Sequence, residues 1–123
     1  MLQTTVKRVL LVDDSKMVLS VHETFLRAAG FECLTAAGGA EALECLMRNK
    51  FDLLVTDLNM PKMDGYELAK RAKEMNPNLP VMMISTESEK TDIDRGLQSG
   101  VDVYMTKPVD PEDFVLRCRM VAG

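Results

Sequence analysis

The residues best suited to chemistry in this sequence are polar side chains at or just after the ends of short apolar runs. They are carboxylates, a hydroxyl and an ammonium: Asp13, Asp14, Asp57, Ser85 and Lys107. Two carboxylates ~5 Å apart repel each other by about 3 kcal/mol at an effective dielectric constant near 20, so a cluster of them requires a positive counter-charge. Mg²⁺ binds through a few carboxylates and completes its shell with water and phosphate oxygens. If the fold brings these side chains together, the sequence predicts a Mg²⁺ site formed by Asp13, Asp14 and Asp57.

The same side chains are suited to phosphoryl transfer. A phosphoryl group attached to Asp57 would have its oxygens neutralised by the metal on one side and by Lys107 on the other, which is how such groups are stabilised. Asp57 is therefore the predicted aspartyl nucleophile. Ser85 carries a hydroxyl that can donate a hydrogen bond to a phosphoryl oxygen.

These side chains can meet only in a fold that gathers strand ends, and the hydropathy pattern predicts one. Short apolar runs alternate with helical patterns along the chain, which is typical of consecutive βα units and a parallel sheet. The right-handed crossovers of such a sheet bring the carboxyl ends of its strands to one edge. We therefore expect an α/β fold with the polar cluster at that edge. The predicted strands are residues 9–12, 32–35, 51–56, 81–84 and 101–105.

Residues with helical spacing indicate which helix faces are buried. Val18, Val21, Phe25 and Ala28 recur at steps of three and four, so they are predicted to form the buried stripe of the first helix. His22 lies beside this stripe and is predicted to be a surface residue. Methionines at core-facing positions are expected to fill the interior. They are Met17, Met47, Met75, Met82 and Met83.

Two later helices carry clear start signals, and a third is weak. Asp64 and Asp110 are predicted N-caps, and Pro111 occupies the first helical position after the second of them. Between the last two predicted strands, only Ile93 and Leu97 form an apolar stripe. We expect the helix in that segment to be labile, because it has little apolar surface to bury.

Length and composition fit one domain covering residues 1–123. The 15 basic and 19 acidic residues give a net charge of −4, which disfavours direct binding to nucleic acid. The cysteines are odd in number and lack metal-ligand spacing, so they are predicted to be buried thiols in a reducing compartment. No apolar run approaches the ~18 residues of a membrane span and no signal sequence is visible, so we expect a cytoplasmic protein without membrane contact.

Four ordered motifs resemble those of a known family. They are VLLVDDS at residues 9–15, FDLLVTDLNMPKMDGYEL at 51–68, VMMIS at 81–85 and GVDVYMTKP at 100–108. The chain resembles the receiver domain of bacterial two-component response regulators, close to the stand-alone chemotaxis type, from about Lys7 to Val121. The resemblance implies a flavodoxin-like, doubly wound (βα)5 fold with a five-stranded parallel sheet in the order 2-1-3-4-5.

The resemblance also implies roles for the polar residues. Asp57 would accept a phosphoryl group from a partner histidine kinase. Asp13 and Asp14 would be the acidic Mg²⁺ pair, and the backbone carbonyl of Asn59 would be a further ligand. Lys107 would contact the phosphoryl group.

Further residues would relay and time the signal by the same resemblance. Ser85 would move onto the phosphoryl group, and Tyr104 would swing inward on activation. The side chains of Asn59 and Glu87 would tune how fast the acyl phosphate hydrolyses. The bond between Lys107 and the following proline is expected to be cis. A downstream protein would bind the surface formed by the helix around Ile93, the strand at 101–105 and the last helix.

Two other classes remain open on the sequence. One is a Mg²⁺-dependent phosphohydrolase with an aspartyl nucleophile, although Asn59 stands where such an enzyme would carry a second acid. The other is a flavin-binding module of similar topology. The acidic residues after the first predicted strand disfavour it, because a flavin phosphate would need hydroxyls and free N–H groups there.

Overall fold

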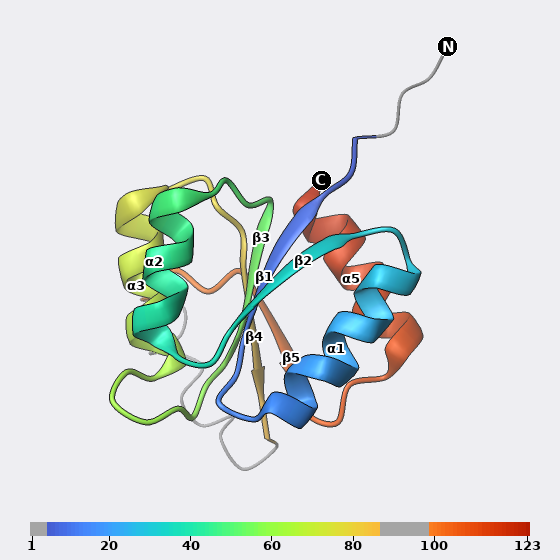
Figure 1. Cartoon of the computed structure of the whole chain (residues 1–123), viewed down its shortest axis with the longest axis horizontal. Coiled ribbons are helices and arrows are strands. Elements are labelled where there is room, and N and C mark those ends of the chain that lie inside the picture. Colours follow the sequence, from blue (N-terminus) through green and yellow to red (C-terminus); the bar gives the residue numbers. More distant parts are fainter. Residues whose placement is uncertain (1–4, 87–98) are drawn as a thin grey trace.

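The computed structural model describes residues 5–86 and 99–123. Five parallel strands form one sheet in the order β2-β1-β3-β4-β5 (Figure 1). The expected α/β fold and strand order are therefore confirmed. The strands are β1 Arg8–Val12, β2 Glu32–Ala36, β3 Leu53–Asp57, β4 Val81–Ser85 and β5 Val103–Thr106.

Helices cover both faces of the sheet. The helices α2 Gly39–Arg48 and α3 Gly65–Met75 lie on one face, and α1 Lys16–Ala28 and α5 Pro111–Ala122 lie on the other (Figure 1). Each face of the sheet has its own hydrophobic core, and successive side chains of β1 point to opposite faces. Leu10 packs in the core under α2 and α3, and Leu11 packs in the core under α1 and α5. The expected helix around Ile93 and Leu97 lies outside the described residues. No helix in the described ranges is long and apolar enough to cross a membrane.

The predicted helix starts are confirmed. The Asp64 side chain accepts a hydrogen bond from the Glu67 backbone N–H at 2.9 Å, and the Asp110 side chain accepts one from the Asp113 N–H at 2.9 Å. Pro111 is the first residue of α5. These caps satisfy backbone donors that the helices themselves leave without partners.

The predicted stripe of α1 is wrong by one position. The buried residues of α1 are Leu19, His22 and Leu26, whereas Val21 is 43% exposed. Two apolar stripes with helical spacing run side by side on this helix, and periodicity alone does not tell which of them faces the sheet. His22, predicted to be a surface residue, is therefore buried.

The prediction for the methionines is correct only on β4. Met82 and Met83 are fully buried in the sheet, but Met17, Met47 and Met75 are 78%, 69% and 44% exposed. Met17, Met47 and Met75 lie where the helix surface turns from the sheet toward solvent, so the core has no room left to cover them. Apolar residue type therefore overestimates the core at helix margins.

Gly65 allows α3 to begin directly against the end of β3. Its backbone N–H donates to the Leu58 carbonyl at 2.8 Å. A Cβ at this position would collide with the Asp57 carbonyl oxygen and would lie 2.7 Å from Met83 Sδ. Only glycine permits this approach without a backbone shift.

We expect Gly65→Ala to lower the free energy of unfolding by about 1–3 kcal/mol, because the new methyl group overpacks a site bounded by backbone atoms. Urea denaturation measures this change. Gly38→Ser is the matched control, since Gly38 is the N-cap of α2 and a Cβ there meets no atom within 4 Å. Its unfolding free energy should stay within about 0.5 kcal/mol of the wild type. Equal stability of Gly65→Ala and the wild type would contradict the close packing of Gly65 against the end of β3.

Candidate functional site

The register of the sheet places the polar residues at one edge. Val12 pairs with Thr56, so the next residues, Asp13 and Asp57, leave neighbouring strands at the same level. On the other side, Ser85 pairs with Thr106, the residue before Lys107. The sheet therefore gathers side chains that are up to 94 residues apart in sequence.

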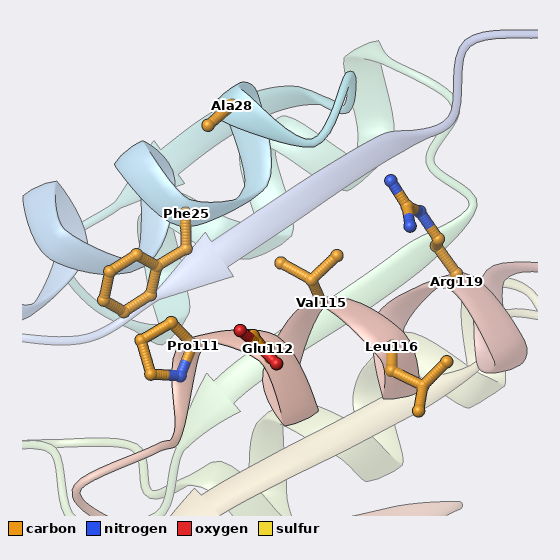
Figure 2. A pocket seen from close by; sticks show the side chains of 7 residues that line it. All are labelled: Phe25, Ala28, Pro111, Glu112, Val115, Leu116 and Arg119. Atoms are coloured by element: carbon orange, nitrogen blue, oxygen red, sulfur yellow. The ribbon is translucent and has the colours of Figure 1, made fainter.

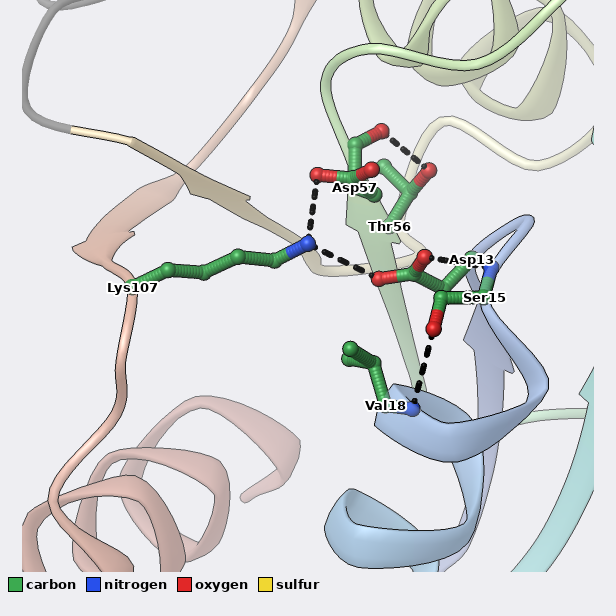
Figure 3. A network of polar contacts seen from close by, with 6 residues as sticks. All are labelled: Asp13, Ser15, Val18, Thr56, Asp57 and Lys107. Atoms are coloured by element: carbon green, nitrogen blue, oxygen red, sulfur yellow. Dashed lines mark hydrogen bonds and ion pairs between the residues drawn. The ribbon is translucent and has the colours of Figure 1, made fainter.

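Lys107 joins the two strand ends through its ammonium group. Its Nζ lies 3.0 Å from Asp13 Oδ2 and 3.1 Å from Asp57 Oδ1 (Figure 3). Asp13 is 4% exposed and Asp57 is 9% exposed, so both ion pairs are largely shielded from water. The other oxygen of Asp13, Oδ1, accepts the Ser15 backbone N–H at 2.9 Å. Asp13 is thus held on both of its oxygens.

Asp14 completes an acidic cluster. One carboxylate oxygen from each of Asp13, Asp14 and Asp57 lies within 4.8 Å of the others, and Asp14 is exposed. Three carboxylates and one ammonium leave a net charge of 1 − 3 = −2 among these four groups. A small group of oxygen ligands with that excess charge, open to solvent on one side, fits a hard divalent cation such as Mg²⁺.

Burial and the neighbouring charges shift the pKa values at this site. Burial raises the pKa of Asp57, and the charge of Asp13 adds to this, while the hydrogen bonds from Lys107 and the Leu58 N–H act in the opposite direction. For Lys107, burial alone would lower the pKa, but the hydrogen bonds to Asp13 and Asp57 raise it overall. Lys107 is therefore a permanent cation at neutral pH. Further positive charge beside Asp57 would favour its ionised form.

Thr56 fixes the backbone of Asp57, a contact that the sequence analysis missed. The Thr56 side chain is fully buried, and its hydroxyl donates to the Asp57 carbonyl oxygen at 2.9 Å (Figure 3). The same carbonyl faces Gly65 at the start of α3. A threonine directly before the predicted nucleophile, in an otherwise apolar strand, is the signal that could have revealed this contact.

His22 is a second residue that the sequence analysis placed wrongly. Its ring packs on Phe114 of α5 with the ring centres 5.1 Å apart. Burial lowers the pKa of His22, the charge of Asp13 raises it, and the charge of Lys107 lowers it again. The imidazole is therefore an uncharged group in the α1 and α5 interface, close enough to the acidic cluster to sense its charges.

The remaining predicted residues lie around the cluster. Ser85 is buried at the end of β4, and its carbonyl accepts the Lys107 backbone N–H at 2.8 Å. Tyr104 is partly buried on β5 and packs against the core on the α2 and α3 side. Asn59 is exposed in the loop after β3. Glu87 lies outside the described residues, and the bond between Lys107 and Pro108 is cis, as expected.

Comparison with known proteins gives the family. The sequence matches the response regulator receiver domain family over residues 9–119. The chain belongs to this family. Receiver domains are signalling switches rather than classical enzymes, and they bind Mg²⁺ through an acidic pocket, so the acidic cluster is in keeping with the family.

Named relatives support this assignment. This receiver domain is 34% identical over 115 residues to the alkaline phosphatase synthesis transcriptional regulatory protein PhoP of Bacillus subtilis, covering 94% of this chain and 48% of PhoP. It is 40% identical over 115 residues to the transcriptional regulatory protein PrrA of Mycobacterium tuberculosis, covering 94% of this chain and 49% of PrrA. The chain therefore spans about half the length of these curated relatives.

Among solved structures, the receiver domain is similar to the chemotaxis response regulator CheY4 of Vibrio cholerae. The TM-score is 0.90 at 32% identity, and the match covers 95% of this chain and 99% of CheY4. The chain thus shares its fold with a protein of about its own length and shares sequence with regulators about twice as long.

The burial of His22 predicts a pH dependence of stability. Below about pH 6.5 the unfolded chain protonates His22, whereas the folded protein, with its lowered pKa, resists protonation. The unfolded state then binds more protons, so this group reduces stability as the pH falls. In His22→Leu that contribution is absent. We expect the unfolding free energy of the wild type, relative to His22→Leu, to decrease from about pH 8 to about pH 5.5.

Urea denaturation of both proteins across this pH range measures the difference, and groups common to both largely cancel. A difference that stays constant, or that grows in favour of the wild type at low pH, would show that His22 is not held in its neutral form.

Proposed function

We propose that this receiver domain is a phosphorylation-dependent switch that accepts a phosphoryl group on Asp57 from the phosphohistidine of a sensor histidine kinase. The observation that carries the proposal is the position of Lys107 Nζ, 3.0 Å from Asp13 and 3.1 Å from Asp57 beside a third carboxylate. A cation between a candidate nucleophile and an acidic cluster is an arrangement suited to holding a phosphoryl group. The proposal also includes the cytoplasmic location of this protein that the sequence predicts.

In the proposed reaction, an oxygen of the Asp57 carboxylate attacks phosphorus. The bond between phosphorus and the histidine nitrogen breaks, the electron pair stays on the imidazole, and an acyl phosphate forms on Asp57. Lys107 is close enough to contact both the carboxylate before the reaction and a phosphoryl oxygen after it. Its pKa is raised, so it keeps its charge throughout.

Asp13, Asp14, Asp57 and the backbone carbonyl of Asn59 would hold Mg²⁺. Bound there, the cation would offset the negative charge of the cluster and of the incoming phosphoryl group. Asp13 is oriented for such a role because Lys107 holds one of its oxygens and the Ser15 N–H holds the other.

Ser85 and Tyr104 are the proposed relay. Ser85 ends β4 next to Lys107, and Tyr104 stands on the adjacent strand β5. Movement of the Ser85 hydroxyl onto the phosphoryl group would free space between the end of β4 and β5. The ring of Tyr104 could then turn inward into that space. A downstream protein would then bind the surface made by β5, α5 and the helix that the sequence predicts around Ile93. Asn59 and Glu87 would set the rate of self-dephosphorylation by their effect on the attacking water.

Acetyl phosphate with Mg²⁺ tests the phosphoryl acceptor. We expect intact-mass spectrometry to find one added phosphoryl group on the wild type and none on Asp57→Asn, because an amide is not a competent nucleophile. Asp113→Asn, at an exposed position on α5, should be modified like the wild type. Undiminished modification of Asp57→Asn would refute the assignment. Steady turnover of a small phosphate ester would instead favour the phosphohydrolase.

Calorimetric titration with Mg²⁺ tests the metal site in the unphosphorylated protein. Asp13→Asn removes one of three clustered charges and should weaken Mg²⁺ binding at least about tenfold, equivalent to ~1.4 kcal/mol. Asp113→Asn serves again as the control and should bind as the wild type does. Equal binding by Asp13→Asn and the wild type would exclude Asp13 from the ligand set.

A further inference from the structure

A groove runs between α1 and α5 on the face of the molecule away from α2 and α3. Its volume is about 380 Å³. Phe25 and Ala28 line it from α1, while Pro111 and Val115 line it from α5 (Figure 2). The walls are mostly apolar, although the groove opens to solvent.

The groove exists because α1 carries more apolar surface than the sheet covers. The stripe of Leu19, His22 and Leu26 faces the sheet. The second stripe, with Phe25 and Ala28, is left at the groove. An apolar surface that a fold leaves in water is typical of a protein interaction site.

The outer side of α5 extends this apolar surface. Leu116 is 55% exposed and Met120 is 72% exposed, both on the same helix as the groove wall. Figure 2 shows Leu116 at the rim, pointing away from α1, whereas Val115 points toward it. Leu116 is therefore placed to enter a neighbouring groove rather than to fill its own.

The charges at the groove are self-complementary. Glu112 and Arg119 both line it and are seven residues apart on α5, which corresponds to about 10.5 Å along a helix. Midway between them lie Val115 and Leu116. A two-fold axis at that midpoint brings Glu112 against the partner's Arg119, and Arg119 against the partner's Glu112. A self-matching patch of this kind is the requirement for an isologous dimer.

We propose that the groove between α1 and α5 is the interface of a homodimer in which two α5 helices pack antiparallel. Leu116 of each copy enters the groove of the other, and two Glu112 to Arg119 ion pairs close its ends. Arg119 also donates to the Ala29 carbonyl at 3.2 Å, and its guanidinium has further N–H donors for a carboxylate. The proposal does not depend on the phosphorylation of Asp57, because it concerns the unphosphorylated chain.

Charge reversal tests the pairing. Sedimentation equilibrium of the unphosphorylated protein should show a dimer whose dissociation constant rises at least about tenfold in Glu112→Arg or Arg119→Glu, since each change turns two attractions into two repulsions. The combined variant restores both pairs in reverse and should return to within about threefold of the wild type. Lys70→Glu on exposed α3 makes the same change in charge as Arg119→Glu and should leave the dimer intact.

A wild-type protein that stays monomeric to ~1 mM would overturn the proposal and leave the groove to a different protein. Failure of the double variant to recover would overturn the antiparallel pairing, provided that its urea unfolding curve shows it folded.

Reversing the charges of Glu112 and Arg119, in the first and last turns of α5, also opposes the dipole of this helix. Leu116→Glu therefore provides a test that does not involve these two charged residues. This variant places a carboxylate in the proposed groove and should weaken the dimer at least about tenfold. Met75→Glu, at a 44% exposed position on α3, is its control and should have no effect. Dimerisation of Leu116→Glu at wild-type strength would overturn the proposal.

Discussion

Repulsion among three carboxylates is the constraint on which the functional edge of this protein depends. Asp13 and Asp57 leave neighbouring strands and have oxygens within 4.8 Å of each other, which at an effective dielectric constant near 20 corresponds to a repulsion of about 3 kcal/mol. Lys107 offsets this by contacting both, but Asp14 brings the total to a net charge of −2. The cluster therefore still attracts a divalent cation strongly, and it also attracts a ligand that already carries such a cation. A fully neutralised site would have no such tendency.

The sheet and the start of α3 supply the rigidity that holds these charges together. Buried strands on both sides of β3 fix its register, so Asp57 cannot move along the strand. Thr56 holds the Asp57 carbonyl through a buried hydroxyl, and Gly65 brings α3 against the same group. The carboxylate is thus presented on a backbone that is fixed from two directions.

The sequence predicted the elements whose signals are local and unambiguous. Short apolar runs located all five strands, and the carboxylates, hydroxyl and ammonium after them were expected at one edge because parallel strands share a direction. The sequence could not choose between the stripes of Val21 and His22 on α1, because both have helical spacing and only the packed sheet selects one. The hydroxyl of Thr56 was missed for a related reason. The residue pattern shows a polar threonine in an apolar strand, but it does not show that the partner of the hydroxyl is the Asp57 backbone carbonyl.

The two helices that border the groove both begin at the functional edge. Ser15, the N-cap of α1, lies two residues after Asp13, and Asp110, the N-cap of α5, lies three residues after Lys107. The ion pair between Asp13 and Lys107 therefore ties together the starts of α1 and α5, and the contact of His22 with Phe114 ties them again farther along. Any displacement of Lys107 has to be taken up in the short segment before α5 or passed to that helix. Because the walls of the groove are α1 and α5, the two helices whose starts the Asp13 and Lys107 ion pair joins are the same two helices that form the groove.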